Sequence, residues 1–112
     1  MTPQRSPITT HVLDTARGRP AAGLAVTLEV KDRDQWVLLA RAKTDADGRV
    51  LDLLPPNHGL TLGTYRLTFA VGPWQEGFFP EVALSFRVTD PEEHYHVPLL
   101  LSPYGYSTYR GT

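Results

Sequence analysis

Histidine is the side chain best suited to proton transfer near neutral pH, and two of the four histidines in this chain are two residues apart. His94 and His96 lie in a run typical of a β-strand, so we expect both side chains on the same face of a sheet. Such a pair could hold a metal ion only with a third ligand from elsewhere. A plainer interpretation leaves His94 in solvent beside Glu93 and makes His96, deeper in the strand, the more interesting residue.

His11 and Arg49 are the next candidates. His11 lies in the middle of a second run of strand-forming residues, where a half-exposed polar residue is common. Arg49 follows the turn sequence Asp45-Ala-Asp-Gly48, a place where an arginine is often merely solvated. The two aspartates of this turn resemble a calcium loop only superficially, because the further ligands of that motif are missing. Position alone therefore assigns no function to either residue.

The last ten residues, Pro103 to Thr112, are aromatic and β-branched where a frayed polar tail would be usual. They end on Tyr109-Arg110-Gly111-Thr112, which would bring a guanidinium, a hydroxyl and a carboxylate to one place. The alternative is an edge strand that ends in solvent. On an extended strand the arginine and the threonine face away from the tyrosine, so a shared site needs a bend that the glycine permits.

The elements that must position these residues are about eight short strands without a convincing helix. Their spacing of 8–12 residues predicts an all-β fold, an antiparallel β-sandwich. Residues 72–77 are too short for more than a turn of helix, and the proline-rich segment from Leu54 to Leu62, with His58, is interpreted as a solvated surface loop. The predicted strands span residues 8–14, 23–30, 36–44, 49–53, 63–71, 82–88, 94–101 and 104–110.

Composition narrows the class of protein. A chain of 112 residues fits one domain, which we assign to residues 8–112 after a flexible N-terminal arm over residues 1–7. The net charge of −1 gives no reason to expect a nucleic acid or an anionic membrane as partner. Without cysteine there is no disulfide or thiolate metal site. No segment looks like a signal peptide or a membrane span, so we expect a cytoplasmic protein.

Several segments resemble, in order, the motifs of the transthyretin-like family. The last motif is long and specific, and together they cover residues 8–112. The closing Tyr-Arg-Gly-Thr is similar to the tetrapeptide of the family's 5-hydroxyisourate hydrolases, which its hormone-carrying transthyretins lack. The matching segments are Ile8-Thr-Thr-His-Val-Leu-Asp-Thr15, Gly18-Arg-Pro-Ala-Ala-Gly23, Thr44-Asp-Ala-Asp-Gly-Arg49, Phe79-Pro-Glu-Val82 and residues 94–112.

The resemblance implies a site and an assembly. It assigns the catalytic trio to His11, Arg49 and His96. It further implies a homotetramer, a dimer of dimers with a central channel and active sites at the dimer–dimer interface. The substrate would be made by urate oxidation, and the product would be decarboxylated on the way to allantoin. The substrate-binding motif would comprise Tyr109, Arg110, Gly111 and Thr112.

The implied chemistry is hydrolysis of a cyclic amide without metal or cofactor. One of the two catalytic histidines would take a proton from the water that attacks C6, while an arginine fork orients the ring. Two departures from the family pattern stand out. Thr112 replaces the more usual serine, and residues 72–77 are shorter than the segment that carries the family's helix. The alternative function is a non-catalytic carrier of small molecules in the same channel.

Overall fold

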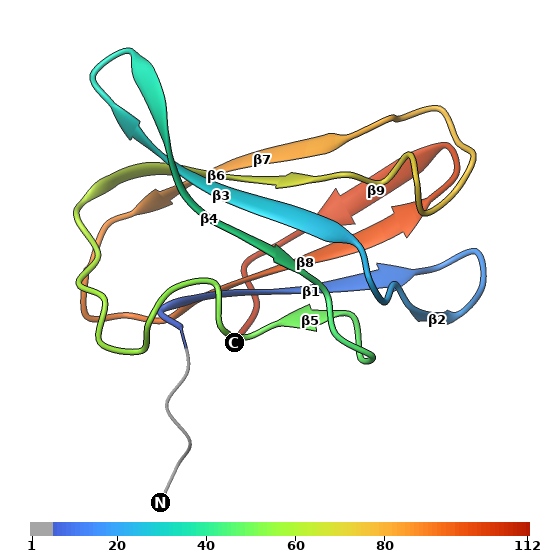
Figure 1. Ribbon diagram of the computed structural model, residues 1–112, viewed down its shortest axis with the longest axis horizontal. Helices are drawn as coiled ribbons and strands as arrows, with labels where there is room; N and C mark the ends of the chain where they lie inside the picture. Colours follow the sequence, from blue (N-terminus) through green and yellow to red (C-terminus); the bar gives the residue numbers. More distant parts are fainter. Residues whose placement is uncertain (1–5) are drawn as a thin grey trace, which may run out of the picture.

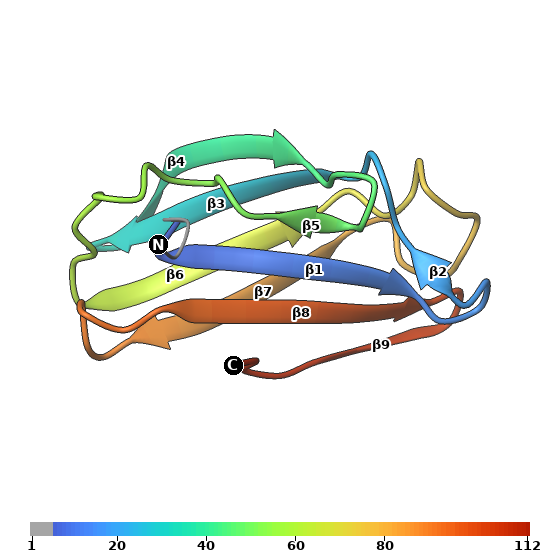
Figure 2. The same cartoon turned by 90° about the horizontal axis from the view of Figure 1, so that it is seen from below.

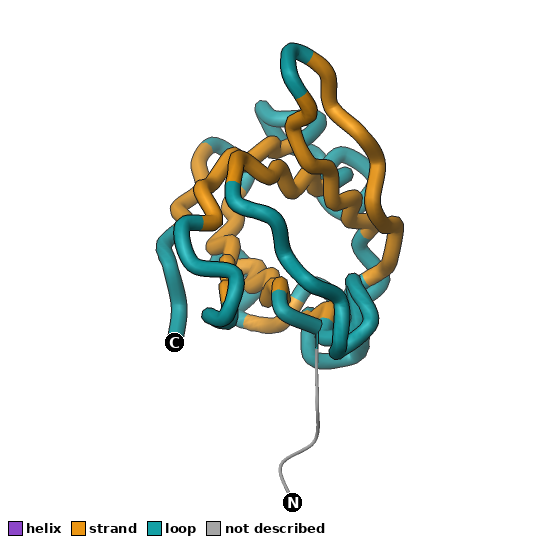
Figure 3. Tube along the Cα trace, turned by 90° about the vertical axis from the view of Figure 1, so that its left-hand side faces the viewer, coloured by secondary structure: helices purple, strands orange, loops and turns teal. Residues whose placement is uncertain are grey.

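The computed structural model describes residues 6–112, which form two β-sheets packed face to face (Figure 1). No helix occurs among these residues, and Figure 3 shows the two layers of strands enclosing the interior. The predicted all-β sandwich is confirmed. The strands are β1 (Ile8–Asp14), β2 (Arg19–Pro20), β3 (Ala25–Asp32), β4 (Gln35–Lys43), β5 (Arg49–Val50), β6 (Gly63–Phe69), β7 (Val82–Val88), β8 (Tyr95–Ser102) and β9 (Gly105–Thr108).

The first sheet has the strand order β2-β1-β8-β9, with β5 paired to β1 beside β2, and the second has the order β4-β3-β6-β7. Figure 2 shows β5, β1, β8 and β9 running side by side. Within residues 6–112 the strands form seven ladders. Six are antiparallel, and the ladder between β1 and β8 is parallel. This parallel pair departs from the predicted antiparallel arrangement, because alternation within a strand carries no information on the direction of its neighbour.

Strict alternation divides the side chains of the first sheet between the core and the outer face. On β1, Ile8 and Val12 are fully buried against the second sheet, whereas His11 on the opposite face is half-buried. On β8, Leu99 and Leu101 are buried in the core. Each large apolar side chain removed from water contributes about 1.5–3 kcal/mol, so this core fixes which residues of β1 and β8 face outward.

The segment between β5 and β6 is a surface loop, as predicted, but two of its leucines are buried. Leu54 and Leu60 are 4% and 6% exposed and join the core, while His58 between them is exposed. The backbone N–H of Leu54 donates to Ser6 Oγ over 3.1 Å, and that hydroxyl donates to the carbonyl of Ile8 over 2.6 Å. This loop therefore anchors the chain at Ser6, part of the predicted arm, of which residues 1–5 lie outside the described residues.

At the other end of β1, a turn at residues 72–74 takes the place of the possible short helix. Trp74 Nε1 donates to Asp14 Oδ2 over 2.8 Å, and Asp14 Oδ1 accepts from the backbone N–H groups of Ala16 and Arg17. Burial raises the pKa of the Asp14 carboxyl, but these hydrogen bonds outweigh burial and hold it below its ordinary value of 3.8. The ionised carboxylate thus ties this turn to the end of β1.

Among residues 6–112, no helix is long and apolar enough to cross a membrane.

Candidate functional site

Pairing of three strands brings the predicted catalytic trio to one face of the first sheet. His11 on β1 lies directly opposite Arg49 on β5, and on its other side it pairs with Pro98 on β8. His96 is two residues before Pro98, so its side chain points to the same face. Strand and residue spacings put the Cα atoms of His11 and His96 roughly 8 Å apart. We call the outer surface formed by Thr9, His11, Arg49, His96 and Pro98 the histidine face.

A tight turn holds Arg49 against β1. Asp45 Oδ1 accepts hydrogen bonds from the backbone N–H groups of Asp47 and Arg49, over 2.8 and 2.9 Å. Gly48 has φ of 76°, and a Cβ there would collide with the carbonyl oxygen of Val12. Only glycine combines this backbone conformation with so close an approach, so the Asp-Gly turn delivers Arg49 to the site.

The same turn orients His11. Its Nε2 atom lies 2.8 Å from the carbonyl oxygen of Asp47. Because a carbonyl only accepts hydrogen bonds, Nε2 of His11 must carry the proton, and the neutral ring keeps its lone pair on Nδ1. The backbone of the turn therefore fixes both the orientation and the tautomer of His11.

Arg49 differs from the other arginines of the described chain. Two of them are half-buried, Arg49 and Arg66, and only Arg66 has a carboxylate partner, Glu29, at 2.8 Å. Within residues 6–112 no Asp or Glu oxygen lies within 4.0 Å of the Arg49 guanidinium. A half-buried guanidinium without a protein carboxylate is suited to bind a planar, electron-rich ligand from solution.

His96 is held on two sides. Its Nδ1 atom lies 2.8 Å from Thr9 Oγ1, and Thr9 is fully buried. The N–H of Gly111 donates to the His96 carbonyl over 2.8 Å, which places that glycine against the ring. A Cβ at Gly111 would lie 2.6 Å from His96 Cδ2, so a larger residue there would displace the ring. Gly111 of the closing tetrapeptide thus serves as a flat support for the imidazole.

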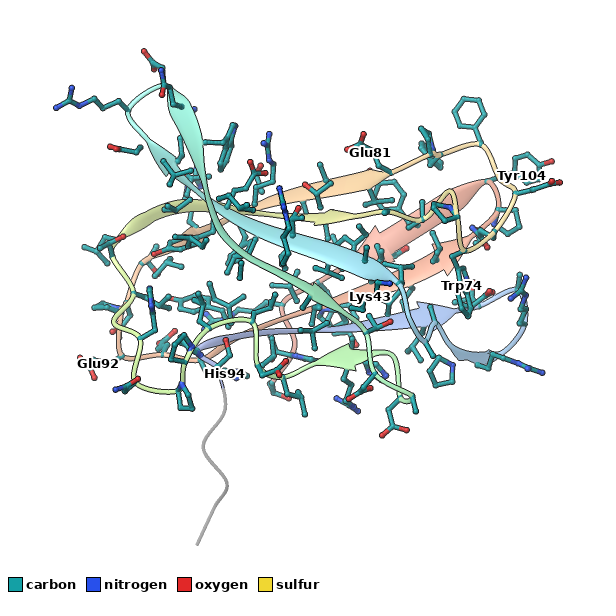
Figure 4. All side chains as sticks on the ribbon, viewed as in Figure 1. Lys43, Trp74, Glu81, Glu92, His94 and Tyr104 are labelled. Carbon is teal, nitrogen blue, oxygen red and sulfur yellow. The ribbon has the colours of Figure 1, made fainter. Side chains whose placement is uncertain are left out.

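His94, predicted to lie in solvent, is instead half-buried and part of the same cluster. Its Nε2 atom is 3.0 Å from Thr9 Oγ1, and its ring stacks on that of His96 with centroids 6.4 Å apart. Figure 4 shows His94 beside the start of β1. Sequence reasoning missed Thr9 and misplaced His94, because the parallel pairing that aligns Thr9 with His96 was not foreseen. Among the described residues, no three His, Asp or Glu side chains are grouped to hold a metal ion.

Arg110 points away from the histidine face. Its Nη2 atom lies 2.7 Å from Glu93 Oε2, and its guanidinium stacks over the ring of Tyr95, which faces the core. The hydrogen bond with Glu93 is the main cause that raises the pKa of Arg110 above its usual value. The strand alternation that separates Arg110 from Gly111 is therefore kept. Tyr109 and Thr112 are exposed.

A cavity of about 310 Å³ opens between the edges of β7 and β9, lined by Phe86, Tyr95, Val97, Thr108 and Arg110 among others. His11, Arg49 and His96 do not line this cavity. It lies toward the inner side of the sheets, whereas the three residues lie on the outer face.

Known proteins resemble this chain in both sequence and fold. The sequence profile described as the HIUase/Transthyretin family matches residues 8–111. The chain belongs to this family. A 5-hydroxyisourate hydrolase of Caulobacter vibrioides is 45% identical over 96% of this chain and 99% of its own length.

Two solved structures that superimpose on this chain are named differently, one as a hydrolase and the other as a transthyretin. The 5-hydroxyisourate hydrolase of Klebsiella pneumoniae superimposes with a TM-score of 0.82 at 34% identity, covering 94% of this chain and 97% of its own. Sea bream transthyretin in complex with thyroxine gives a TM-score of 0.86 at 29% identity, covering 96% of each chain. The fold alone thus does not separate hydrolases from transthyretins, and the side chains of the histidine face must do so.

Proposed function

We propose that this protein hydrolyses 5-hydroxyisourate to 2-oxo-4-hydroxy-4-carboxy-5-ureidoimidazoline, a step of urate degradation on the way to allantoin. The observation that carries the proposal is the convergence of His11, Arg49 and His96 on one sheet face from strands far apart in the chain. The 45% identity to a protein named 5-hydroxyisourate hydrolase supports the same reaction.

His96 is the general base of the proposed reaction. Its Nδ1 side is occupied by Thr9, so proton uptake falls to Nε2. Water attacks C6 of the substrate and gives one proton to Nε2 of His96. The C6–N1 bond then breaks, and the imidazolium returns that proton to N1, which becomes the terminal nitrogen of the ureido group. Such proton transfer by a positioned histidine accelerates a reaction by about 10²–10⁴-fold.

His11 and Arg49 bind and polarise the substrate. The Nε2 proton of His11 is held by the Asp47 carbonyl, so this ring presents Nδ1 as an acceptor for a ring N–H. The guanidinium of Arg49 offers paired donors that match a carbonyl–nitrogen–carbonyl edge and stabilise the negative charge developing on the C6 oxygen. This division of roles follows from the tautomer of His11, which the sequence could not supply.

The closing residues contribute unequally to the proposed site. Gly111 supports the His96 ring, and Tyr109, two residues earlier, is exposed and would contact substrate on the same face. Thr112 is exposed and would reach the substrate through a bend after Gly111. Arg110 is bound to Glu93 and Tyr95, which favours a structural role over the substrate contact that the resemblance implied. The threonine hydroxyl of Thr112 replaces the usual serine without loss of a hydrogen-bonding group.

A homotetramer, a dimer of dimers, is part of this proposal. The histidine face lies on the outer side of the first sheet, where a facing copy would exclude water and complete the substrate pocket around the channel. A cytoplasmic location agrees with the absence of cysteine, since the fold requires no oxidising compartment.

The deciding experiment generates 5-hydroxyisourate in the cuvette from urate and follows its ultraviolet decay with and without the purified protein. We expect decay far above the spontaneous rate at catalytic amounts of protein. Decay at the spontaneous rate, with a folded tetramer verified by sedimentation, would overturn the hydrolase proposal. A stable monomer in sedimentation would overturn the interfacial site.

The similarity to thyroxine-bound transthyretin supports a second candidate, a carrier that uses the same channel without turnover. The two functions differ in one measurement. A carrier would bind thyroxine, as measured by titration calorimetry, and would leave the decay of 5-hydroxyisourate unchanged. A hydrolase would accelerate this decay whether or not thyroxine binds. The half-buried histidines and the unpaired Arg49 favour the hydrolase.

A further inference from the structure

A buried hydroxyl links two imidazole rings on the histidine face. Thr9 Oγ1 lies 2.8 Å from His96 Nδ1 and 3.0 Å from His94 Nε2. Thr9 is 0% exposed, and within residues 6–112 its hydroxyl has no other hydrogen-bonding partner. The hydroxyl must therefore use its single proton toward one of the two rings, because an unused buried donor costs about 1–3 kcal/mol.

The single proton of the Thr9 hydroxyl couples the tautomers of the two imidazole rings. If Thr9 donates to His94 Nε2, it accepts from His96, which then carries its proton on Nδ1 and its lone pair on Nε2. If Thr9 donates to His96 instead, the neutral His96 carries its proton on Nε2 and has no lone pair there. Only the first arrangement leaves His96 able to take a proton from water at Nε2.

The first arrangement also suits the protonated state. After His96 has taken a proton at Nε2, its Nδ1–H continues to donate to Thr9, and Thr9 continues to donate to His94. No hydrogen bond of the chain must reverse during the reaction, which is the condition for a preorganised base. In the second arrangement, proton uptake would require Thr9 and His94 to reverse together.

The geometry points to Thr9 and His94 as positioning residues that hold His96 in the tautomer with its lone pair on Nε2. This inference rests on the hydrolase function proposed above for His96. The role of Thr9 toward His96 parallels that of a second group that fixes the tautomer of a histidine base, while His94 directs the threonine hydroxyl.

The neighbouring threonine provides the contrast. Thr10 is also fully buried, but its hydroxyl donates to the carbonyl of Val97 over 2.6 Å and touches no imidazole. Thr10 therefore has a purely structural hydrogen bond between β1 and β8. Substituting each of these two adjacent threonines in turn therefore distinguishes two effects. One is the loss of a buried hydroxyl, and the other is the loss of the hydroxyl that fixes the tautomer of His96.

The first test compares Thr9→Val, Thr9→Ser and Thr10→Val in the 5-hydroxyisourate decay assay. Valine keeps the shape of threonine and removes the hydroxyl, so we expect kcat of Thr9→Val to fall about 10–100-fold with KM changed less than about threefold. Thr9→Ser, which keeps the hydroxyl, restores most of kcat. Thr10→Val keeps kcat, whatever it does to stability. An unchanged kcat in Thr9→Val, or an equal loss in Thr10→Val, overturns the inference.

A second pair of variants tests His94. Glutamine can present an amide oxygen near the place of Nε2 and accept from Thr9, whereas leucine cannot. We expect His94→Leu to lose about tenfold in kcat and His94→Gln to retain most of it. Equal activities of these two variants would remove His94 from the chain of hydrogen bonds.

A readout without substrate separates this inference from the proposed reaction. The ¹⁵N shifts of the His96 ring, measured above the pH at which it protonates, report which nitrogen carries the proton. We expect the proton on Nδ1 in the wild type and in Thr9→Ser, and a shift toward Nε2 in Thr9→Val. A wild-type ring protonated on Nε2 overturns the inference, even if the protein hydrolyses 5-hydroxyisourate. An Nδ1 proton in a protein without hydrolase activity would overturn only the function.

Discussion

The outer faces of the two sheets use polar side chains in different ways. On the second sheet, Arg66 of β6 pairs with Glu29 of β3 at 2.8 Å and lies over the Trp36 ring at 4.2 Å, with Lys31 on the same ring. We call this the charged face. Its cations are already matched by protein groups, whereas Arg49 on the histidine face has no carboxylate partner among residues 6–112.

This difference between the charged face and the histidine face indicates separate roles, one in stability and the other in the proposed chemistry. Both faces follow the same alternation, and both lie over the same core. On the charged face Arg66 is engaged by Glu29 and by the Trp36 ring, so it stabilises the sheet and has little left to offer a ligand. On the histidine face the ring of His11 is oriented by a backbone carbonyl and the ring of His96 by a buried hydroxyl.

The strongest way to break this comparison is to remove the proposed base. We expect His96→Ala to lower kcat/KM by at least about 100-fold, because general-base catalysis by histidine contributes that much or more. The matched control is His58→Ala, since His58 is exposed on the loop between β5 and β6. Sedimentation verifies that both variants assemble alike. A His96→Ala protein with wild-type turnover would remove His96 from the mechanism.

The two half-buried arginines give the next contrast. We expect Arg49→Met to lower kcat/KM by about 100-fold, since one oriented donor to a developing oxyanion is worth that much, with little change in stability. Arg66→Met should leave turnover intact and cost about 1 kcal/mol or less, because its ion pair with Glu29 is partly exposed to solvent. Thermal unfolding and the decay assay on both variants check this. Equal losses of activity would mean that the faces do not differ as described.

A smaller change in rate is expected from Gly111→Ala. The added Cβ would lie 2.6 Å from His96 Cδ2, so the imidazole must move. Misplacement by an ångström can cost about 100-fold, and we expect roughly tenfold here because the closing residues at the sheet edge can yield. The loss should appear in kcat, with the fold preserved in circular dichroism. Gly105→Ala, whose Cβ meets only Ser102 Oγ at 3.7 Å, is the control and should keep its rate.

Asp14→Asn should have the smallest effect on turnover and a clear effect on stability. Asn has one acceptor oxygen for the donors of Ala16, Arg17 and Trp74, so we expect a loss of about 2 kcal/mol at pH 7. Because the folded-state pKa of Asp14 is lowered, its contribution is present above 3.8 and is lost as pH falls through the folded-state value. Urea unfolding of both proteins from pH 7 to pH 3 should therefore show the difference shrinking. A difference in unfolding free energy that stays constant with pH would contradict the stabilising role of the ionised Asp14 carboxylate.

Much of the fold could be predicted from local pattern. The bounds of β1 and β7, at residues 8–14 and 82–88, agree with the prediction because turn-forming residues flank both runs of apolar alternation. The two-residue strand β2 was missed, since so short a pairing has no pattern of its own. The buried leucines of the loop after β5 were also missed, because prolines at 55 and 56 favour a loop but do not indicate its depth.

The site could be predicted only in part. The resemblance supplied His11, Arg49 and His96, and the pairing of β1 with β5 and β8 gathers them on one face. What local pattern could not supply is which atoms of a side chain are already engaged. The Asp47 carbonyl on His11 and the Thr9 hydroxyl on His96 join residues 36 and 87 positions apart, and no spacing rule connects such pairs.

The parallel pairing of β1 with β8 also bears on how the protein is made. During synthesis β1 leaves the ribosome long before its partner, because Ile8 and Tyr95, which lie opposite each other, are 87 positions apart (95 − 8). Contacts between such distant segments slow folding, because a long loop must close before they form. The histidine face therefore cannot assemble on a nascent chain until residues 95–111 have emerged, so this face forms late in synthesis.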